Sequence, residues 1–264
     1  MLPIVHLFGC TVQSYYLCAA LAGLTGLVLS AYTLKREGLG AWRFLLPLLM
    51  AIAALVGART LNFLLDPGAY GPDFPVWSLA YRSLSLMGGL ICGVLTVFAF
   101  GALTKCDPFK LTDVLVLPAG ISVALLKLGC FLNGCCFGKP TQGILGVEIP
   151  ANETMYDYLE TLPLFGRQVR TVYPTQFFEM MGALAGLAIV ECVCRRRKLP
   201  EGGRAILYAT WFTLVRLAVH PIRSFPYEKR VVALFYPMFY CTVLIALAVT
   251  FFMRMKRVSM KEEG

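Results

Sequence analysis

Apolar residues gather into seven long runs, each close to the roughly 20 residues that a helix needs to cross a bilayer. The first run has no lysine or arginine before it and is long enough to span, so we expect a membrane helix and not a cleavable signal peptide. The pattern predicts an all-α polytopic membrane protein with one integral-membrane domain over residues 1–264. The seven predicted transmembrane helices are Ser14–Leu34, Phe44–Leu65, Leu84–Leu103, Val114–Leu132, Phe177–Val193, Ile206–His220 and Val231–Met253.

Basic residues are divided unequally between the two sides of these helices. Fourteen lysines and arginines lie in the segments after the odd-numbered helices, and seven lie on the opposite side. Lysine and arginine concentrate in cytoplasmic segments. We therefore expect the N-terminus outside and the C-terminal tail, residues 254–264, in the cytoplasm.

Composition supports a membrane protein. Hydrophobic residues make up 58% of the sequence, charged residues make up 15%, and the mean hydropathy is +0.70. A soluble domain averages about 45–50% apolar and about 25% charged residues. In a soluble protein, the net charge of +9 would suggest a nucleic-acid partner, whereas in a membrane protein such charge first determines orientation. The run Arg195–Lys198 suits an interaction with lipid headgroups. We expect no nucleic-acid partner.

Two long loops fall on the outer side, Asp66–Ser83 and Asn133–Gln176. The second, residues 133–176, is long enough to form a small extracytoplasmic cap. Within it, Asn152–Leu162 has the pattern of a capped amphipathic helix. That helix would lie either on the membrane surface or against the cap.

Ionisable residues also occur inside the predicted spans, where each charge costs a few kcal/mol. Glu179 can pair with one cation, which leaves positive charge in surplus at the outer headgroup level. The abundant anion at that level is a lipid phosphate, which arginine binds with two hydrogen bonds and lysine binds as a point charge. The alternative is that each cation snorkels or interacts with a helix C-terminus. The residues concerned are Arg59, Lys127, Glu179, Arg216 and His220, of which Arg216 and His220 share one helix face.

The segment KLGCFLNGCCFGKPT, residues 127–141, combines charge, an amide and three glycines that permit close backbone approach. It resembles the signature segment of the prolipoprotein diacylglyceryl transferases, a family of enzymes that lipidate bacterial lipoproteins. Shorter stretches resemble other motifs of the family in the same order. These are Ser14-Tyr15, Gly57-Ala58-Arg59, Ser85–Leu90, Tyr173–Glu179, and Arg216 followed by His220.

The resemblance implies transfer of the diacylglyceryl group of phosphatidylglycerol to the cysteine thiol of a lipoprotein signal peptide. A thioether would form and glycerol phosphate would leave. The implied partners are phosphatidylglycerol, the prolipoprotein signal peptide and the membrane, and the implied location is the bacterial plasma (inner) membrane. Two alternatives stay open: a same-fold transferase with another acceptor or lipid, and a non-catalytic membrane protein that binds lipid or another anion.

This chain departs from the family pattern at five positions. Lysine at position 127 keeps the positive charge of the usual arginine but lacks the planar guanidinium group, which can donate two parallel hydrogen bonds. The other changes remove groups of the family's usual proton-transfer scheme. Cys130 replaces an asparagine, Cys135 a glutamate, Met87 a histidine, and His220 a glutamate.

The implied reaction needs cations for the departing phosphate, and a base or positive field for the thiol. We expect Lys127 and Arg216 to bind the phosphate, with Arg59 in support. His220 is either the base or a helix-end residue that interacts with the last carbonyls. The other predicted substrate-binding residues are Tyr15, Gly88, Gly89, Asn133, Gly134, Gly138, Gln176 and Glu179.

Three of the ten cysteines, Cys130, Cys135 and Cys136, lie in the signature segment. Their spacing is not CxxC, and no histidine or second cysteine pair completes a zinc pattern. The sequence therefore predicts no metal and no soluble cofactor. The three thiols either have a redox or acyl-carrying role, or fill the space of the family's polar residues.

Overall fold

Seven helices long and apolar enough to cross a membrane run through the part of the chain that the structure describes. The structure, a computed structural model, describes residues 2, 4–7, 10–71, 75–76, 84–148, 171–225 and 227–262. The predicted all-α, seven-span class is confirmed. The helices are α1 (Ser14–Arg36), α2 (Leu45–Leu65), α3 (Leu86–Thr104), α4 (Pro108–Asn133), α6 (Thr175–Arg196), α7 (Gly203–Val219) and α8 (Tyr236–Glu262).

Two helices extend beyond the apolar runs that predicted them. Helix α4 begins at Pro108 instead of Val114, because the Asp107 carboxylate accepts a hydrogen bond from the Phe109 amide at 2.8 Å and caps the helix. Helix α8 follows one π-helical turn and continues to Glu262, so most of residues 254–264 prolongs a transmembrane helix. Hydropathy finds the apolar core of a helix and misses polar turns at its ends.

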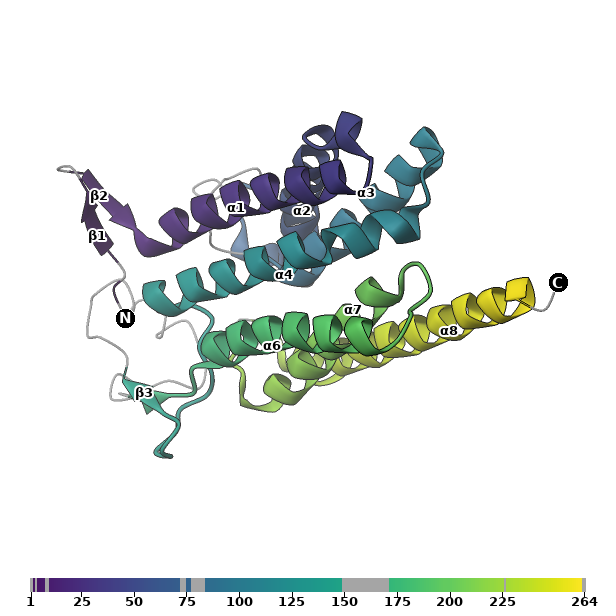
Figure 1. Ribbon diagram of the computed structural model, residues 1–264. Coiled ribbons are helices and arrows are strands. Elements are labelled where there is room, and N and C mark those ends of the chain that lie inside the picture. The colour runs from purple at the N-terminus through teal and green to yellow at the C-terminus, as the bar shows by residue number, and fades with distance from the viewer. Residues whose placement is uncertain are drawn as a thin grey trace.

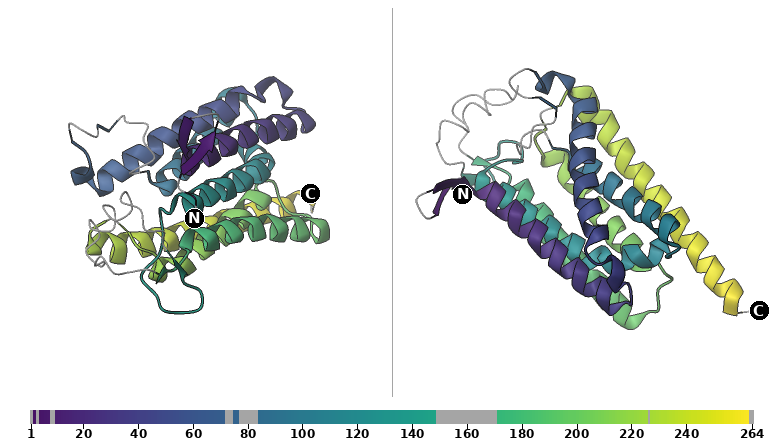
Figure 2. Two further views of the ribbon diagram at one scale, coloured as in Figure 1. Left: turned by 90° about the vertical axis from the view of Figure 1, so that its left-hand side faces the viewer. Right: turned by 90° about the horizontal axis from the view of Figure 1, so that it is seen from above.

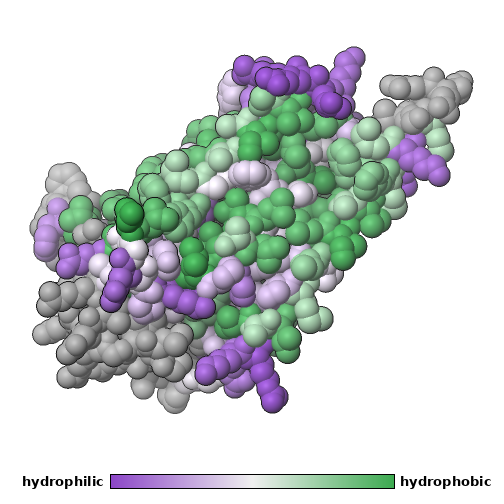
Figure 3. Space-filling model, turned by 90° about the horizontal axis from the view of Figure 1, so that it is seen from below, coloured by the Kyte–Doolittle hydropathy of each residue, from purple (hydrophilic) through white to green (hydrophobic). Residues whose placement is uncertain are grey.

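Helix α4 lies at the centre of the bundle, in contact with α1, α3, α6 and α7 (Figures 1 and 2). Helices α1 and α4 lie side by side along their length, and α2 packs against α3. The α2–α3 crossing is close enough to require glycine, because a Cβ atom on Gly88 would lie 2.1 Å from the Gly57 carbonyl oxygen. On the face seen in Figure 3, apolar side chains cover the middle and hydrophilic ones gather toward the two ends, as a membrane-spanning bundle requires.

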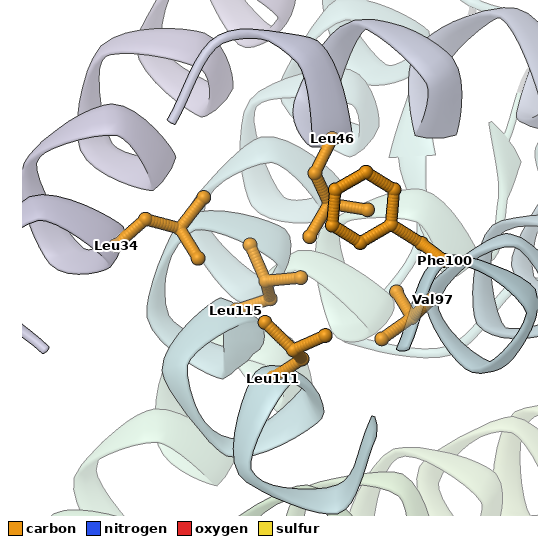
Figure 4. Close-up of a cluster of buried hydrophobic side chains, with 6 residues drawn as sticks. All are labelled: Leu34, Leu46, Val97, Phe100, Leu111 and Leu115. Carbon is orange, nitrogen blue, oxygen red and sulfur yellow. The ribbon is translucent and has the colours of Figure 1, made fainter. Parts of the chain in front are cut away.

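One end of the bundle is closed by apolar packing between the ends of α1, α2, α3 and α4 (Figure 4). Ion pairs lie at the same end: Lys110 contacts Glu37, and Arg254 contacts Asp107 and Glu201. The basic ends of α1 and α8 thus meet at one end of the bundle. Which side of the membrane this end faces stays a prediction. The buried apolar residues are Leu34, Leu46, Val97, Phe100, Leu111 and Leu115.

The opposite end carries short antiparallel strands that the sequence did not predict (Figure 1). Strands β1 (Ile4–Leu7) and β2 (Cys10–Gln13) form a hairpin before α1, and β3 (Val147–Glu148) pairs with β4 (Thr171–Val172). The β3–β4 pair belongs to the segment expected to form the cap. The helix predicted over Asn152–Leu162 lies outside the described residues.

We expect Asp113→Ala to destabilise the fold without touching the opposite end of the bundle. The Asp113 carboxylate, on α4, accepts hydrogen bonds from the amides of Gly202 at 2.8 Å and Ala205 at 2.9 Å, and so caps α7 from another helix. Loss of such a cap lowers the free energy of unfolding by about 1–2 kcal/mol.

Reversible unfolding in mixed micelles measures the effect, and Asp113→Asn, which keeps one carbonyl oxygen, is the matched control with a smaller loss. An Asp113→Ala protein as stable as the wild type would contradict the assignment of this cap.

Candidate active site

A buried carboxylate, Glu179, brings three cations together near the strand-bearing end of the bundle. The Lys127 Nζ atom contacts Glu179 Oε2. The Arg216 Nη1 atom donates to Oε1 at 2.7 Å, and Arg223 Nη1 donates to the same oxygen at 2.5 Å. We call these four residues the ion cluster. Glu179 thus pairs with three cations, more than the single pairing counted from the sequence.

Three packed helices and one turn place the ion cluster. Lys127 lies in α4, Glu179 near the start of α6, and Arg216 in the last turn of α7. Helix α4 contacts both α6 and α7, and a short 3₁₀ turn, His220–Ile222, follows α7 and delivers Arg223. Side chains that are far apart in the sequence therefore meet at one level of the bundle.

The signature segment folds back over this level instead of continuing into the cap. Gly134 ends α4 in the left-handed conformation, with φ at 75°. The Gly138 amide donates to the Tyr173 carbonyl at 2.7 Å, and the Lys139 amide donates to Ile222 at 2.7 Å. A Cβ atom on Gly138 would lie 2.5 Å from the Ile222 carbonyl oxygen, so only glycine fits there.

The start of α6 holds the same segment from the other side. The Thr175 hydroxyl donates to the Cys136 carbonyl at 2.8 Å, and Gln176 Nε2 donates to the Cys135 carbonyl at 3.2 Å. Both side chains are fully buried. Gln176 thus positions the signature backbone, and its expected binding of substrate stays a prediction.

Arg223 is the site residue that sequence reasoning missed. It was counted among the charges of the outer loops, because it follows the end of the sixth apolar run. The backbone of Gly138 pairs with that of Arg223, and this long-range pairing turns the arginine toward Glu179. No local pattern predicts such a pairing. The available signal was a further arginine only seven positions after Arg216.

The ion cluster keeps more positive than negative charge in a place with little water. Glu179 is fully buried, and 5% of the Lys127 and Arg216 residues is exposed. Burial alone would lower the pKa of the Arg223 guanidinium, but the neighbouring Glu179 carboxylate raises that pKa above its ordinary value, so Arg223 stays a cation. One carboxylate faces three cations, and the surplus favours an anionic ligand.

Two hydrogen-bond donors of the cluster have no protein acceptor among the described residues. They are the buried Nε–H groups of Arg216 and Arg223. Buried donors of this kind are nearly always satisfied, and a charged donor left without a partner is costly. An anion placed beside the two guanidinium groups would accept both hydrogen bonds.

Aromatic side chains from α8 line the other side of Arg216. Its Nη2 atom donates to the Tyr240 hydroxyl at 3.3 Å. The His220 ring lies 6.1 Å from the Tyr240 ring and 5.1 Å from Phe225, measured between centroids. Arg216 and His220 therefore both face Tyr240, as their spacing predicted, although His220 lies in the turn after α7. Its Nδ1 atom is buried and has no partner among the described residues.

Arg59 belongs to a neighbouring polar group on α2. Its guanidinium lies 5.8 Å from the centre of the Tyr70 ring. The Tyr70 hydroxyl donates to Asn62 Oδ1 at 2.7 Å, and Asn62 Nδ2 donates to the Tyr227 hydroxyl at 2.7 Å. The three cations paired with Glu179 are Lys127, Arg216 and Arg223, so the supporting role expected of Arg59 stays a prediction.

The remaining predicted residues divide between helix contacts and the signature segment. Gly88 packs against Gly57, and a Cβ atom on Gly89 would lie 3.2 Å from the Ala54 carbonyl oxygen, so both serve the α2–α3 crossing. Tyr15, in α1, lies within electrostatic range of the signature thiols. Asn133 is the last residue of α4, directly before the turn.

The three signature thiols form a second cluster beside the first. The Sγ atoms of Cys130, Cys135 and Cys136 all lie within 4.8 Å of one another, and all three cysteines are free. Hydrogen bonds from the other two thiols, with the charges of Arg223 and Lys127, hold the pKa of Cys136 well below its usual range. We call these residues the thiol cluster; their sequence spacing gave no sign that the sulfur atoms would meet.

We expect Glu179→Gln to destabilise the protein strongly. The amide keeps the shape of the side chain but leaves three buried cations without a counter-charge, and breaking a buried ion pair from one side costs roughly 3–5 kcal/mol. The free energy of unfolding in mixed micelles measures the loss.

Glu191→Gln is the matched control, because Glu191 lies on the same helix and pairs with Arg195 at the surface. Equal midpoints for the two variants would show that the Glu179 carboxylate does not hold the cluster.

Comparison with known proteins identifies the family. The family model described as prolipoprotein diacylglyceryl transferase matches residues 3–254. Proteins named phosphatidylglycerol–prolipoprotein diacylglyceryl transferase are similar along most of their length. The one from Clostridium tetani is 26% identical over 86% of this chain and 87% of its own, and the one from Prochlorococcus marinus is 27% identical over 82% and 76%. With seven membrane helices, a buried cation cluster and a family match over nearly its whole length, this chain belongs to the prolipoprotein diacylglyceryl transferase family.

Proposed function

We propose that this protein transfers the diacylglyceryl group of phosphatidylglycerol to the cysteine thiol of a prolipoprotein signal peptide. The observation that carries the proposal is a pair of buried arginine Nε–H groups with no acceptor in the described part of the chain, beside a cluster with surplus positive charge. Family membership supports the reaction class. The ion cluster supports the part of that reaction in which a phosphate leaves.

The ion cluster suits a phosphate whose charge grows during the reaction. As the bond between the glyceryl carbon and the phosphate oxygen breaks, the oxygen takes the electron pair and glycerol phosphate gains negative charge. Fixed cations in a site with little water stabilise such a charge far better than water-exposed cations do. Arg216 and Arg223 would bind the phosphate through guanidinium N–H groups, and Lys127 would add charge.

Glu179 would act as a positioning residue in this scheme. Without it, three buried cations would repel one another and turn away from a common point. With it, their charged ends are fixed around one carboxylate before substrate arrives. Such preorganisation avoids reorganisation at the moment of reaction.

The depth of the site agrees with a lipid substrate. The ion cluster lies at the end of the bundle where α1 begins, and the distribution of basic residues predicts that this end faces outward. A phospholipid of the outer leaflet of the bacterial inner membrane would present its phosphate at this level. We propose that membrane as the location of the protein.

Met87 stands where the family usually has a histidine, and it packs in an apolar cluster. Met87 is buried against Tyr236 and Tyr240, and a thioether cannot accept a proton from a thiol at neutral pH. His220, whose buried Nδ1 atom has no hydrogen-bond partner among the described residues, is the candidate proton acceptor. His220 and Arg216 both lie next to Tyr240 in the structure.

The proposal predicts lipid transfer by the purified chain in vesicles of phosphatidylglycerol. A peptide that carries a lipoprotein signal-peptide cysteine should gain the mass of a diacylglyceryl group. Removal of one charge-stabilising group typically lowers a rate by about 10²–10³-fold. We therefore expect Arg216→Gln, Arg223→Gln and Lys127→Met to lower transfer by at least about 100-fold, as measured by mass spectrometry.

Arg195→Gln is the control, since Arg195 is exposed on α6 and pairs only with Glu191 in the described structure. Wild-type transfer by a folded Arg216→Gln protein would contradict the phosphate-binding role. The folded wild type could instead fail to modify this peptide from phosphatidylglycerol but transfer to another acceptor or from another lipid. That result would contradict the proposed reaction and assign the fold a different one.

A further inference from the structure

We propose that Cys130, Cys135 and Cys136 form a three-thiolate site for a zinc-class divalent metal ion, whose fourth coordination position takes the acceptor thiol. Neither the family assignment nor the phosphate-binding role of the ion cluster includes this site. The part that concerns the acceptor thiol rests on the proposed function.

The geometry of the thiol cluster is close to that of a metal site. The three Sγ atoms lie within 4.8 Å of one another. Zinc binds thiolate sulfur at about 2.3 Å, which places two sulfur atoms of a tetrahedral site about 3.8 Å apart. Inward rotations of about 1 Å or less would bring the three sulfur atoms to bonding distance of one ion.

The backbone is built to bring the two loop thiols back over the helical one. Cys130 lies in the last turn of α4, and the Cys135 amide donates to its carbonyl at 3.0 Å. Cys136 has φ at 61°, a conformation that a non-glycine residue rarely adopts. The hydrogen bonds from Thr175 and Gln176 to the carbonyls of Cys136 and Cys135 hold this conformation. A strained residue held by its surroundings is typical of a functional site.

The surrounding charge would support a thiolate at Cys136, and the bound ion itself would supply the charge that stabilises Cys130 and Cys135 as thiolates. Buried thiolates need compensating positive charge. The charges of Arg223 and Lys127 act on the Cys136 sulfur, and both belong to the ion cluster, where cations outnumber the carboxylate. A divalent ion would compensate two of the three thiolate charges, and part of this positive surplus would compensate the third.

The number of ligands indicates an open position. Structural zinc sites have four protein ligands, whereas catalytic sites have three and leave the fourth to water or substrate. Within the described residues, the group holds these three cysteines and no further histidine, cysteine or carboxylate. The sequence spacing, with Cys135 next to Cys136, differs from CxxC, which is why the pattern predicted no metal.

An open position next to a phosphate site suits the alkylation of a thiol. On binding the metal, the acceptor thiol would lose its proton to water, because a metal-bound thiol is deprotonated. Its sulfur would then attack the glyceryl carbon, forming the C–S bond as the C–O bond breaks. The electron pair would leave with the phosphate oxygen, and the metal ion would keep its oxidation state. The thioether product is a weaker ligand than a thiolate and would dissociate.

Cobalt titration of the full chain tests the metal site. The reduced, metal-stripped protein in micelles is titrated with Co²⁺, which absorbs in the near ultraviolet when bound by thiolates. We expect saturation at one ion per chain and displacement by Zn²⁺. Cys130→Ser or Cys135→Ser should weaken Co²⁺ binding by at least about 100-fold, because each removes a ligand. Cys192→Ser/Cys194→Ser, near the opposite end of α6, is the matched control that should bind like wild type.

Absence of thiolate absorption in the wild-type titration would overturn the site, whatever the variants do. Absorption that survives both single variants would overturn it as well. Addition of the acceptor peptide to the Co²⁺ form should change the spectrum by supplying a fourth sulfur, and a peptide with serine in place of the cysteine should not. An unchanged spectrum would overturn the acceptor-binding role.

The metal site and the proposed function fail in different ways. A protein that shows the Co²⁺ spectrum and its peptide-dependent change, yet transfers no diacylglyceryl group, would support the site and contradict the function. Transfer by a protein that binds neither Co²⁺ nor Zn²⁺ would support the function and contradict the site.

Discussion

The Glu179 carboxylate is the constraint on which the site depends. Three cations that arise from α4, α7 and the turn after α7 would separate in a bundle with little water, and one carboxylate shared among them prevents this. The carboxylate satisfies only part of their hydrogen-bonding capacity. The same interaction thus joins three elements of the fold and leaves a positively charged place whose two Nε–H donors have no acceptor among the described residues. In the proposed function, stability and substrate binding would have one physical origin.

In the proposed reaction the two clusters would divide the chemical work of alkylating a thiol. The ion cluster would offer positive charge to a departing phosphate, and the charges of Lys127 and Arg223 also act on the thiol cluster. Residues that differ from the family pattern, Cys130 and Cys135, are members of the thiol cluster. Two of the five departures therefore fall together in space, whereas Met87 fills apolar space next to Tyr236.

The sequence predicts this fold well and the site only in part. Seven spans follow from apolar length, and Lys127, Glu179 and Arg216 follow from the cost of charge inside a membrane. Arg223 could not be predicted, because its position depends on backbone pairing with Gly138, a contact between distant segments. The meeting of the three thiols depends on a positive φ at Cys136, which local patterns do not reveal for a cysteine. Polar helix ends, such as the Asp107 cap, were missed for the same local reason.

Lipid selection by the intact protein tests most directly whether the Glu179-organised cations bind a phospholipid phosphate. Native mass spectrometry from micelles that contain equal phosphatidylglycerol and diacylglycerol, which has the same acyl chains but no phosphate, would report the lipid retained. The account predicts a preference for phosphatidylglycerol of at least about tenfold, equivalent to about 1.4 kcal/mol, which Arg223→Gln removes. Equal retention of the two lipids by the wild type, or a preference that Arg223→Gln leaves unchanged, would contradict it.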